Sequence, residues 1–122
     1  MMPVLRRNLA ATAEAAETAR TWIRTAISAG HPRISVTDAA YITAEMVTAA
    51  LVHTPEGGLI EVHLFPARSG GLVIKVTDPN VPVGPHPGDW ARISCIARNF
   101  GAGATAEGSH VMWCELPEVP SP

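Results

Sequence analysis

The chain has 122 residues, of which 47% are hydrophobic and 16% are charged, and its formal net charge is −2. This composition is typical of one globular domain with a single core; it excludes a disordered chain and gives no general reason to expect binding to nucleic acid or an anionic membrane. The apolar runs are too short to span a bilayer, and glutamates interrupt the segment where a signal peptide would be apolar, so we expect a cytoplasmic protein.

The first part of the chain predicts a short leading strand over residues 1–9 and then a helix over residues 13–29. Thr12 is the expected cap of this helix, and Gly30 ends it. Six mostly apolar residues fall on one face at helical spacing and are expected to pack on the rest of the domain: Ala15, Ala19, Trp22, Ile23, Ala26 and Ile27.

Residues 36–53 predict a second amphipathic helix, around which the rest of the chain is organised. Thr37 is its expected N-cap, since a threonine hydroxyl can accept from an amide in the first turn. Glu45 is a single carboxylate on a face of small and apolar side chains, and Ala49 follows it one turn later on the same stripe. What this stripe faces decides the function of the protein.

Alternating side chains predict two strands, residues 59–65 and 72–78, joined by a hairpin turn over residues 68–71. Residues 79–88 contain four prolines and two glycines, so they are expected to form a loop without helix or strand pairing. Long loops in compact domains are usually lids or binding loops.

A third helix is predicted over residues 89–100, followed by a small, polar connection over residues 101–108. Alternation then predicts a last strand over residues 109–116. The tail, residues 117–122, contains three prolines and is expected to fray.

This order of elements predicts one domain over residues 1–122, with its core in residues 10–116. The expected architecture is a two-layer α/β sandwich of the α+β kind. In it, about three helices cover one face of a mostly antiparallel or mixed sheet of four or five strands.

Five segments in this order resemble the GHKL (histidine-kinase-like) ATPase superfamily, and in particular the small actinobacterial proteins related to anti-sigma-factor serine kinases. These segments are LAATAEAAETARTWIR, TAEMVTAALVH, VTDPNVP, GDWARISCIARNFG and GSHVMWCEL. The resemblance covers nearly the whole chain and implies the histidine-kinase-like ATPase fold, which is a sandwich of the kind expected above.

The resemblance also implies roles for single residues. Glu45 stands at the position of the general base, and Asp78 at that of the carboxylate that accepts from the adenine amino group. The asparagine that binds Mg²⁺ in the family is replaced by Ala49, whose methyl group cannot coordinate a metal. The threonine of the last strand is replaced by Val111, which has no hydroxyl.

The glycine-rich lid of the family supplies backbone amides to the phosphates, and here Pro87, Gly88 and Asp89 stand in its place. Pro87 has no N–H group, and Asp89 brings negative charge toward the phosphates. If Trp90 and Val111 also fill the pocket, ATP cannot enter. We therefore expect a degenerate nucleotide site with no metal and no cofactor; ATP and Mg²⁺ would be used only by an active enzyme.

The same residues also have plain structural interpretations. Glu45 can be a solvent-facing helix residue, and Asp78 before a proline can be a turn former at a strand end. Cys95 and Cys114 have no zinc-like spacing and are expected to be reduced, half-buried thiols. Surface or capping roles, rather than metal binding, are expected for His31, His53, His63, His86 and His110.

Three functions remain open from the sequence. The preferred hypothesis is a non-enzymatic regulator that binds a protein partner, such as a sigma factor or an anti-sigma antagonist, with homodimerisation as an option. The second is an active ATP-dependent serine protein kinase that phosphorylates an antagonist protein through Glu45 and Asp78. The third is a domain whose pocket has been repurposed for another small ligand.

Overall fold

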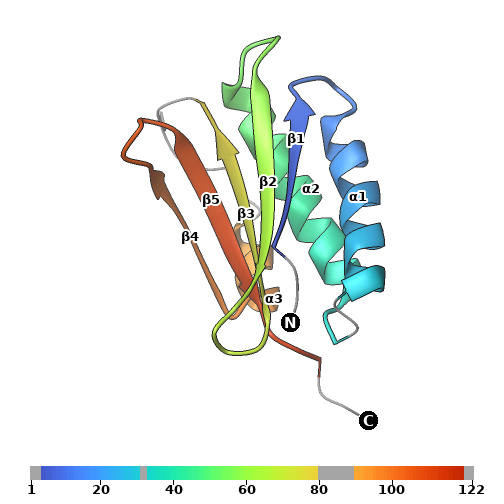
Figure 1. The fold of residues 1–122 in the computed structure, drawn as a ribbon. Helices are drawn as coiled ribbons and strands as arrows, with labels where there is room; N and C mark the ends of the chain where they lie inside the picture. Colours follow the sequence, from blue (N-terminus) through green and yellow to red (C-terminus); the bar gives the residue numbers. More distant parts are fainter. Residues whose placement is uncertain (1–3, 31–32, 80–89, 120–122) are drawn as a thin grey trace.

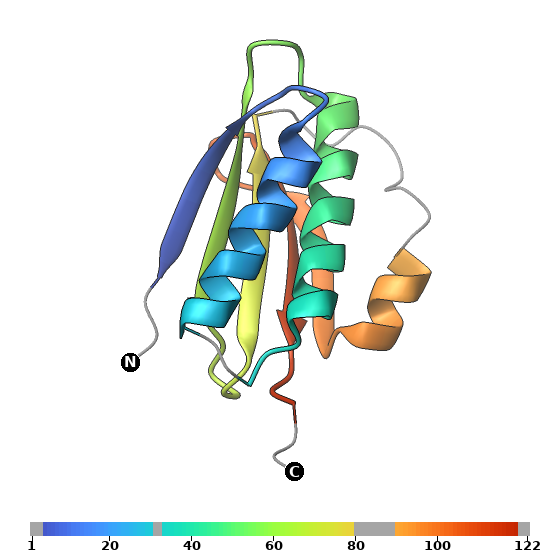
Figure 2. The same cartoon turned by 90° about the vertical axis from the view of Figure 1, so that its right-hand side faces the viewer.

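The computed structural model describes residues 4–30, 33–79 and 90–119, with the backbone alone for His53 and Trp90. Its elements in chain order are β1 (Leu5–Ala10), α1 (Ala15–Gly30), α2 (Val36–His53), β2 (Leu59–Pro66), β3 (Leu72–Asp78), α3 (Trp90–Ile96), β4 (Asn99–Ala104) and β5 (His110–Leu116). The strands form one antiparallel sheet in the order β1-β2-β3-β5-β4, and the helices lie on one side of it (Figures 1 and 2). The expected two-layer α+β sandwich is therefore confirmed.

The core lies between the sheet and the pair α1 and α2, which pack side by side (Figure 2). On β3 and β5, burial alternates residue by residue, so one side chain in two points toward the helices. The largest fully buried apolar side chains come from both layers: Ile23, Ile27, Ile42, Met46, Val47, Ile60, Leu64, Leu72, Ile74 and Met112. None of the helices within the described ranges is long and apolar enough to cross a membrane.

The N-cap of α2 is Ser35, so the expectation that Thr37 caps this helix was wrong. The Ser35 hydroxyl accepts a hydrogen bond from the Asp38 amide at 3.2 Å, whereas Thr37 lies inside the first turn. Both hydroxyls are of the kind that caps helices, and the path of the chain after α1 decides between them. Similarly, α1 begins at Ala15, two residues later than expected, after a turn in which the Thr12 carbonyl accepts from the Ala15 amide.

The region after the proline-rich loop differs most from the expectation. The third helix ends at Ile96 rather than residue 100, and Asn99–Ala104 form β4 where a helix end and a polar connection were expected. The sequence Asn-Phe-Gly-Ala-Gly-Ala has a low intrinsic strand preference. Pairing with β5 makes it a strand, beginning where the Arg98 amide donates to the Glu115 carbonyl at 2.8 Å.

The first residues of the tail are held in place, contrary to expectation. The Val119 amide donates to the Arg33 carbonyl at 2.6 Å, and an Arg33 Nη1 lies 3.5 Å from Glu118 Oε2. The tail thereby closes over the connection between the two long helices. The remaining tail, residues 120–122, lies outside the described residues.

The cap assignment leads to a stability prediction. Ser35→Ala should lower the free energy of unfolding by about 1 kcal/mol, because the Asp38 amide loses its side-chain acceptor. Thr37→Ala is the matched control and should change it by less than about 0.5 kcal/mol. Urea unfolding followed by far-UV circular dichroism measures both, and a larger effect of Thr37→Ala would contradict the assignment.

Candidate functional site

The candidate site lies on the helix side of the sheet, where α2 faces the end of β3. Glu45 is half-buried on α2, one turn after Tyr41 and one turn before Ala49, so the three residues share one flank of the helix. The Arg92 guanidinium of α3 lies 4.7 Å from the centre of the Tyr41 ring, so this flank faces α3 (Figure 2). Glu45 is thus placed at the border of the core and not on the open surface.

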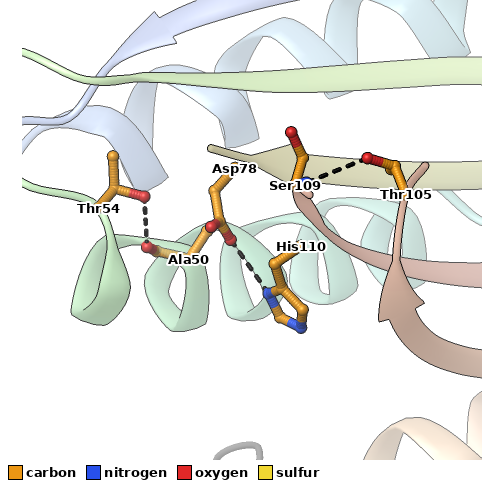
Figure 3. A network of polar contacts seen from close by, with 6 residues as sticks. All are labelled: Ala50, Thr54, Asp78, Thr105, Ser109 and His110. Carbon is orange, nitrogen blue, oxygen red and sulfur yellow. Dashed lines mark hydrogen bonds and ion pairs between the residues drawn. The ribbon is translucent and has the colours of Figure 1, made fainter. Parts of the chain in front are cut away.

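Asp78, the last residue of β3, is paired with His110, the first residue of β5. The two residues are direct partners in the antiparallel register, and His110 Nδ1 lies 3.1 Å from Asp78 Oδ2 (Figure 3). The His110 side chain is 1% exposed and the Asp78 side chain is 0% exposed. An ionised carboxylate can only accept hydrogen bonds, so with Asp78 ionised the proton sits on His110 Nδ1.

This pair decides what Asp78 can do. The residue that the family resemblance assigns to the adenine amino group already has an imidazole partner from its own chain. Displacing the imidazole would leave two buried polar groups to be satisfied, which in proteins is costly. His110 takes one oxygen of this carboxylate, and the role of Asp78 in adenine binding stays a prediction.

The metal position does not fit Mg²⁺. Ala49 is 5% exposed and presents a methyl group where the family has an amide oxygen. Within the described ranges, no three His, Cys, Asp or Glu side chains gather closely enough to hold a metal ion. Ala49 therefore does not supply the metal ligand that the family resemblance implies at this position.

Val111 lies on the other side of the sheet, so the expectation that it borders or fills the pocket was wrong. It pairs with Thr77 and is half-buried, whereas its neighbour His110 points to the helix side. The residue opposite Asp78 is accordingly His110. The lid positions Pro87, Gly88 and Asp89 lie outside the described part of the structure, and so does the Trp90 side chain, which was considered above as a residue that fills the pocket.

His110 is the site residue that sequence analysis missed, because a surface or capping role was expected for it. The alternation of Met112 and Cys114 on β5, extended back by two residues, would have placed His110 on the buried face. No sequence signal gives its partner, since Asp78 is 32 residues earlier and the register is set by pairing.

The other histidine in the sheet, His63 on β2, lies on the opposite face and is half-buried. Its Nε2 has no hydrogen-bond partner among the described residues. Burial, followed by the charges of Arg6 and Lys75, lowers the pKa of His63 from its ordinary value of 6.5, and Glu61 opposes this shift. The imidazole is therefore neutral at physiological pH.

The two cysteines differ, contrary to the expectation of two half-buried thiols. Cys95 is exposed on α3, and Cys114 is buried on β5. Burial, assisted by the nearby Glu115 charge, raises the pKa of the Cys114 thiol to about 12, so it stays protonated and unreactive. Neither cysteine contributes to the candidate site.

Comparison with known proteins finds a similarity of fold alone. No family model matches the chain, and no curated protein matches it. The fold is similar to that in a crystal structure of the RsbU and RsbW domains of Rv1364c from Mycobacterium tuberculosis, with a TM-score of 0.67 and 21% sequence identity. The similarity covers 99% of this chain and 35% of that chain, so the present chain spans about a third of its relative.

This similarity confirms the fold that the sequence resemblance implied. At this level of identity it carries the architecture and leaves the activity to be argued from the residues. Glu45 and Asp78 therefore keep their roles as predictions only.

The buried pair leads to a prediction about stability. His110→Ala and Asp78→Asn should each lower the free energy of unfolding by about 3 kcal/mol, because either change leaves the other group buried without its partner. The double variant should lose less than the sum of the two, by about 1 kcal/mol or more. His63→Ala, on the other face, is the control and should cost about 1 kcal/mol or less; equal costs for His63→Ala and His110→Ala in urea unfolding would contradict the assignment.

The lowered pKa of His63 leads to a prediction about pH. The midpoint of its titration, followed by the NMR signal of its Cε1 proton, should lie below 6.5, and Arg6→Ala should raise it. Because the unfolded chain takes up this proton near pH 6.5 and the folded chain takes it up at lower pH, the free energy of unfolding should fall as the pH drops below about 6.5. A midpoint at or above 6.5 would contradict the lowering of the His63 pKa by burial and the neighbouring cations.

Proposed function

We propose that this protein is a regulator of the anti-sigma-factor type that acts by binding another protein and not by catalysis. The observation that carries the proposal is the buried Asp78–His110 pair, in which an imidazole takes one oxygen of the carboxylate that an adenine site would need and both side chains are closed to solvent. Ala49 supports it independently, because the metal ligand is replaced by a methyl group. The scaffold around these positions is intact, so what has changed is the chemistry of one site.

Binding to a protein partner is compatible with such a closed site, because folds of this kind carry interaction surfaces apart from any nucleotide pocket. A sigma factor or an anti-sigma antagonist is the proposed partner class, and a cytoplasmic location and a homodimer belong to the same proposal. The relative with known structure holds RsbU and RsbW domains in one longer chain, which fits a role within a regulatory system.

Nucleotide titration tests the closed site directly. Isothermal titration calorimetry of the wild-type chain with Mg-ATP and with Mg-ADP should show no binding tighter than about 1 mM. Micromolar binding of either nucleotide would contradict the proposal.

A pair of variants tests whether His110 is what closes the site. His110→Thr removes the imidazole from the Asp78 carboxylate, and adenosine, which needs no phosphate or metal contacts, should bind this variant at least about tenfold more tightly than the wild type. His63→Thr makes the same chemical change on the other face of the sheet and should bring no gain.

The competing hypothesis is the active serine kinase, with Glu45 as the general base and water in place of the missing metal ligand. It requires phosphate transfer from ATP to an antagonist protein, and this transfer should be abolished by Glu45→Gln. Detection of such transfer would replace the proposed function by the kinase.

A further inference from the structure

The sheet face opposite the helices carries an ordered set of side chains that the proposed site does not use. In Figure 1 this face is turned obliquely toward the viewer, with α1 to the right of the sheet and α2 partly behind it, and no described helix lies in front of it. We call it the outer face. It consists of the alternate, half-exposed positions of the strands, and its central strands are β2, β3 and β5.

One cross-strand row on the outer face is basic and ends in an aromatic ring. The antiparallel registers place Arg6 opposite His63, His63 opposite Lys75, and Lys75 opposite Trp113. Direct partners on one face stand about 5 Å apart. Arg6 and Lys75 are thus held at a fixed spacing on rigid strands, and neither forms an ion pair with a described residue.

The indole of Trp113 lies against the backbone of β4 because its partner there is Gly101. A Cβ atom at Gly101 would stand 2.8 Å from Cζ2 of the indole, which is too close for any side chain. The glycine therefore leaves room for the ring to lie along the sheet. Phe65 adds a second aromatic ring, with its centroid 5.0 Å from that of His63.

The outer face continues into a groove of about 590 Å³ at the β2–β3 hairpin. Arg68 and Arg98 line this groove over an apolar floor that includes Phe65 and Val73. Glu115 is the acidic residue among those that line the groove, and one of its carboxylate oxygens accepts a hydrogen bond from the Ser69 hydroxyl at 2.7 Å. Neither arginine is in an ion pair with a described residue.

The charges identify the chemistry of a binding partner. The row and the groove carry four of the nine basic residues of the chain, Arg6, Lys75, Arg68 and Arg98, and one of its eleven acidic residues, Glu115. Glu61, beside the row on β2, is the second carboxylate of the outer face. The row and the groove together therefore keep an excess of basic side chains on a chain of net charge −2, and this surface attracts carboxylates. A second copy is disfavoured, because it would bring two surfaces with the same excess of positive charge together. Nucleic acid is disfavoured because the floor of the groove, with Phe65 and Val73, is apolar and matches the apolar side chains of a peptide better than a phosphate backbone.

We propose that the outer face binds an acidic, partly apolar segment of a partner protein, whose carboxylates meet Arg6, Lys75, Arg68 and Arg98 and whose apolar side chains meet Trp113 and Phe65. The inference rests on the proposed function, since it names the surface and the chemistry of the partner of that regulator. It assigns partner binding to the side of the sheet away from Asp78.

The test uses the full chain without nucleotide and two short peptides as probes. One peptide alternates glutamate with leucine, and the other has glutamine in place of each glutamate. Fluorescence anisotropy should show at least about tenfold tighter binding of the acidic peptide. In ¹H–¹⁵N NMR spectra, the acidic peptide should shift the Lys75 amide and the Trp113 indole signals.

Charge reversals on the protein complete the test. Lys75→Glu and Arg98→Glu should each weaken binding of the acidic peptide about tenfold, and Arg98 is exposed, so its variant is expected to fold even if Lys75→Glu does not. Arg24→Glu makes the same change on the exposed surface of α1 and should leave binding unchanged. Equal weakening by Arg24→Glu, equal binding of the two peptides, or shifts confined to the helix side would overturn the proposal.

Two further outcomes separate the alternatives. Tighter binding of single-stranded oligo-uridine RNA than of the acidic peptide would overturn the inference in favour of nucleic acid. Light scattering gives the second outcome: a dimer that the acidic peptide does not dissociate but that Trp113→Glu does would overturn it in favour of a second copy. The nucleotide titrations are independent of these measurements. Micromolar ATP binding with intact peptide binding would remove the proposed function and leave the outer face as a binding surface.

Discussion

The antiparallel pairing of β3 with β5 is the constraint on which both sides of this molecule depend. Antiparallel partners share a face of the sheet, and successive residues alternate between faces. One register therefore sets Asp78 against His110 on the helix side and Lys75 against Trp113 on the outer side. A shift of one residue would exchange the two faces of β5, bringing Val111 into the core and placing His110 outside.

The Asp78–His110 pair fixes which group the Asp78 carboxylate contacts more than it adds to the net free energy of folding. Moving two polar groups out of water costs free energy that their mutual attraction only partly offsets, so a buried pair is no sign of a stable fold by itself. Its consequence is that the carboxylate at the end of β3 is committed to a partner within the chain. The loss at Ala49 has a different cause, since a methyl group has no lone pair to offer. Both features bear on the nucleotide site that the family resemblance implies, and they act through unrelated chemistry.

The outer face is built from the same strands, but its side chains interact with solvent and not with a packed core. Its side chains are half-exposed, its charges are screened by solvent, and its spacing is set by strand geometry instead of close packing. A change in the pocket between sheet and helices consequently need not alter it. This separation is compatible with the two proposals made above, a site without nucleotide chemistry on one side of the sheet and a surface for protein binding on the other.

The sequence by itself determined the elements whose side chains repeat with a clear period, namely α1, α2 and the hairpin of β2 and β3, and from their order the sandwich fold. It also singled out Glu45, Asp78 and Ala49, through the resemblance of their segments to a known family. Only the tertiary structure decided that Asn99–Ala104 is a strand, that Ser35 caps α2, and that His110 is the partner of Asp78. The physical reason is the same in each case: local propensity was weak or evenly divided, and the deciding contact came from a part of the chain outside the local pattern.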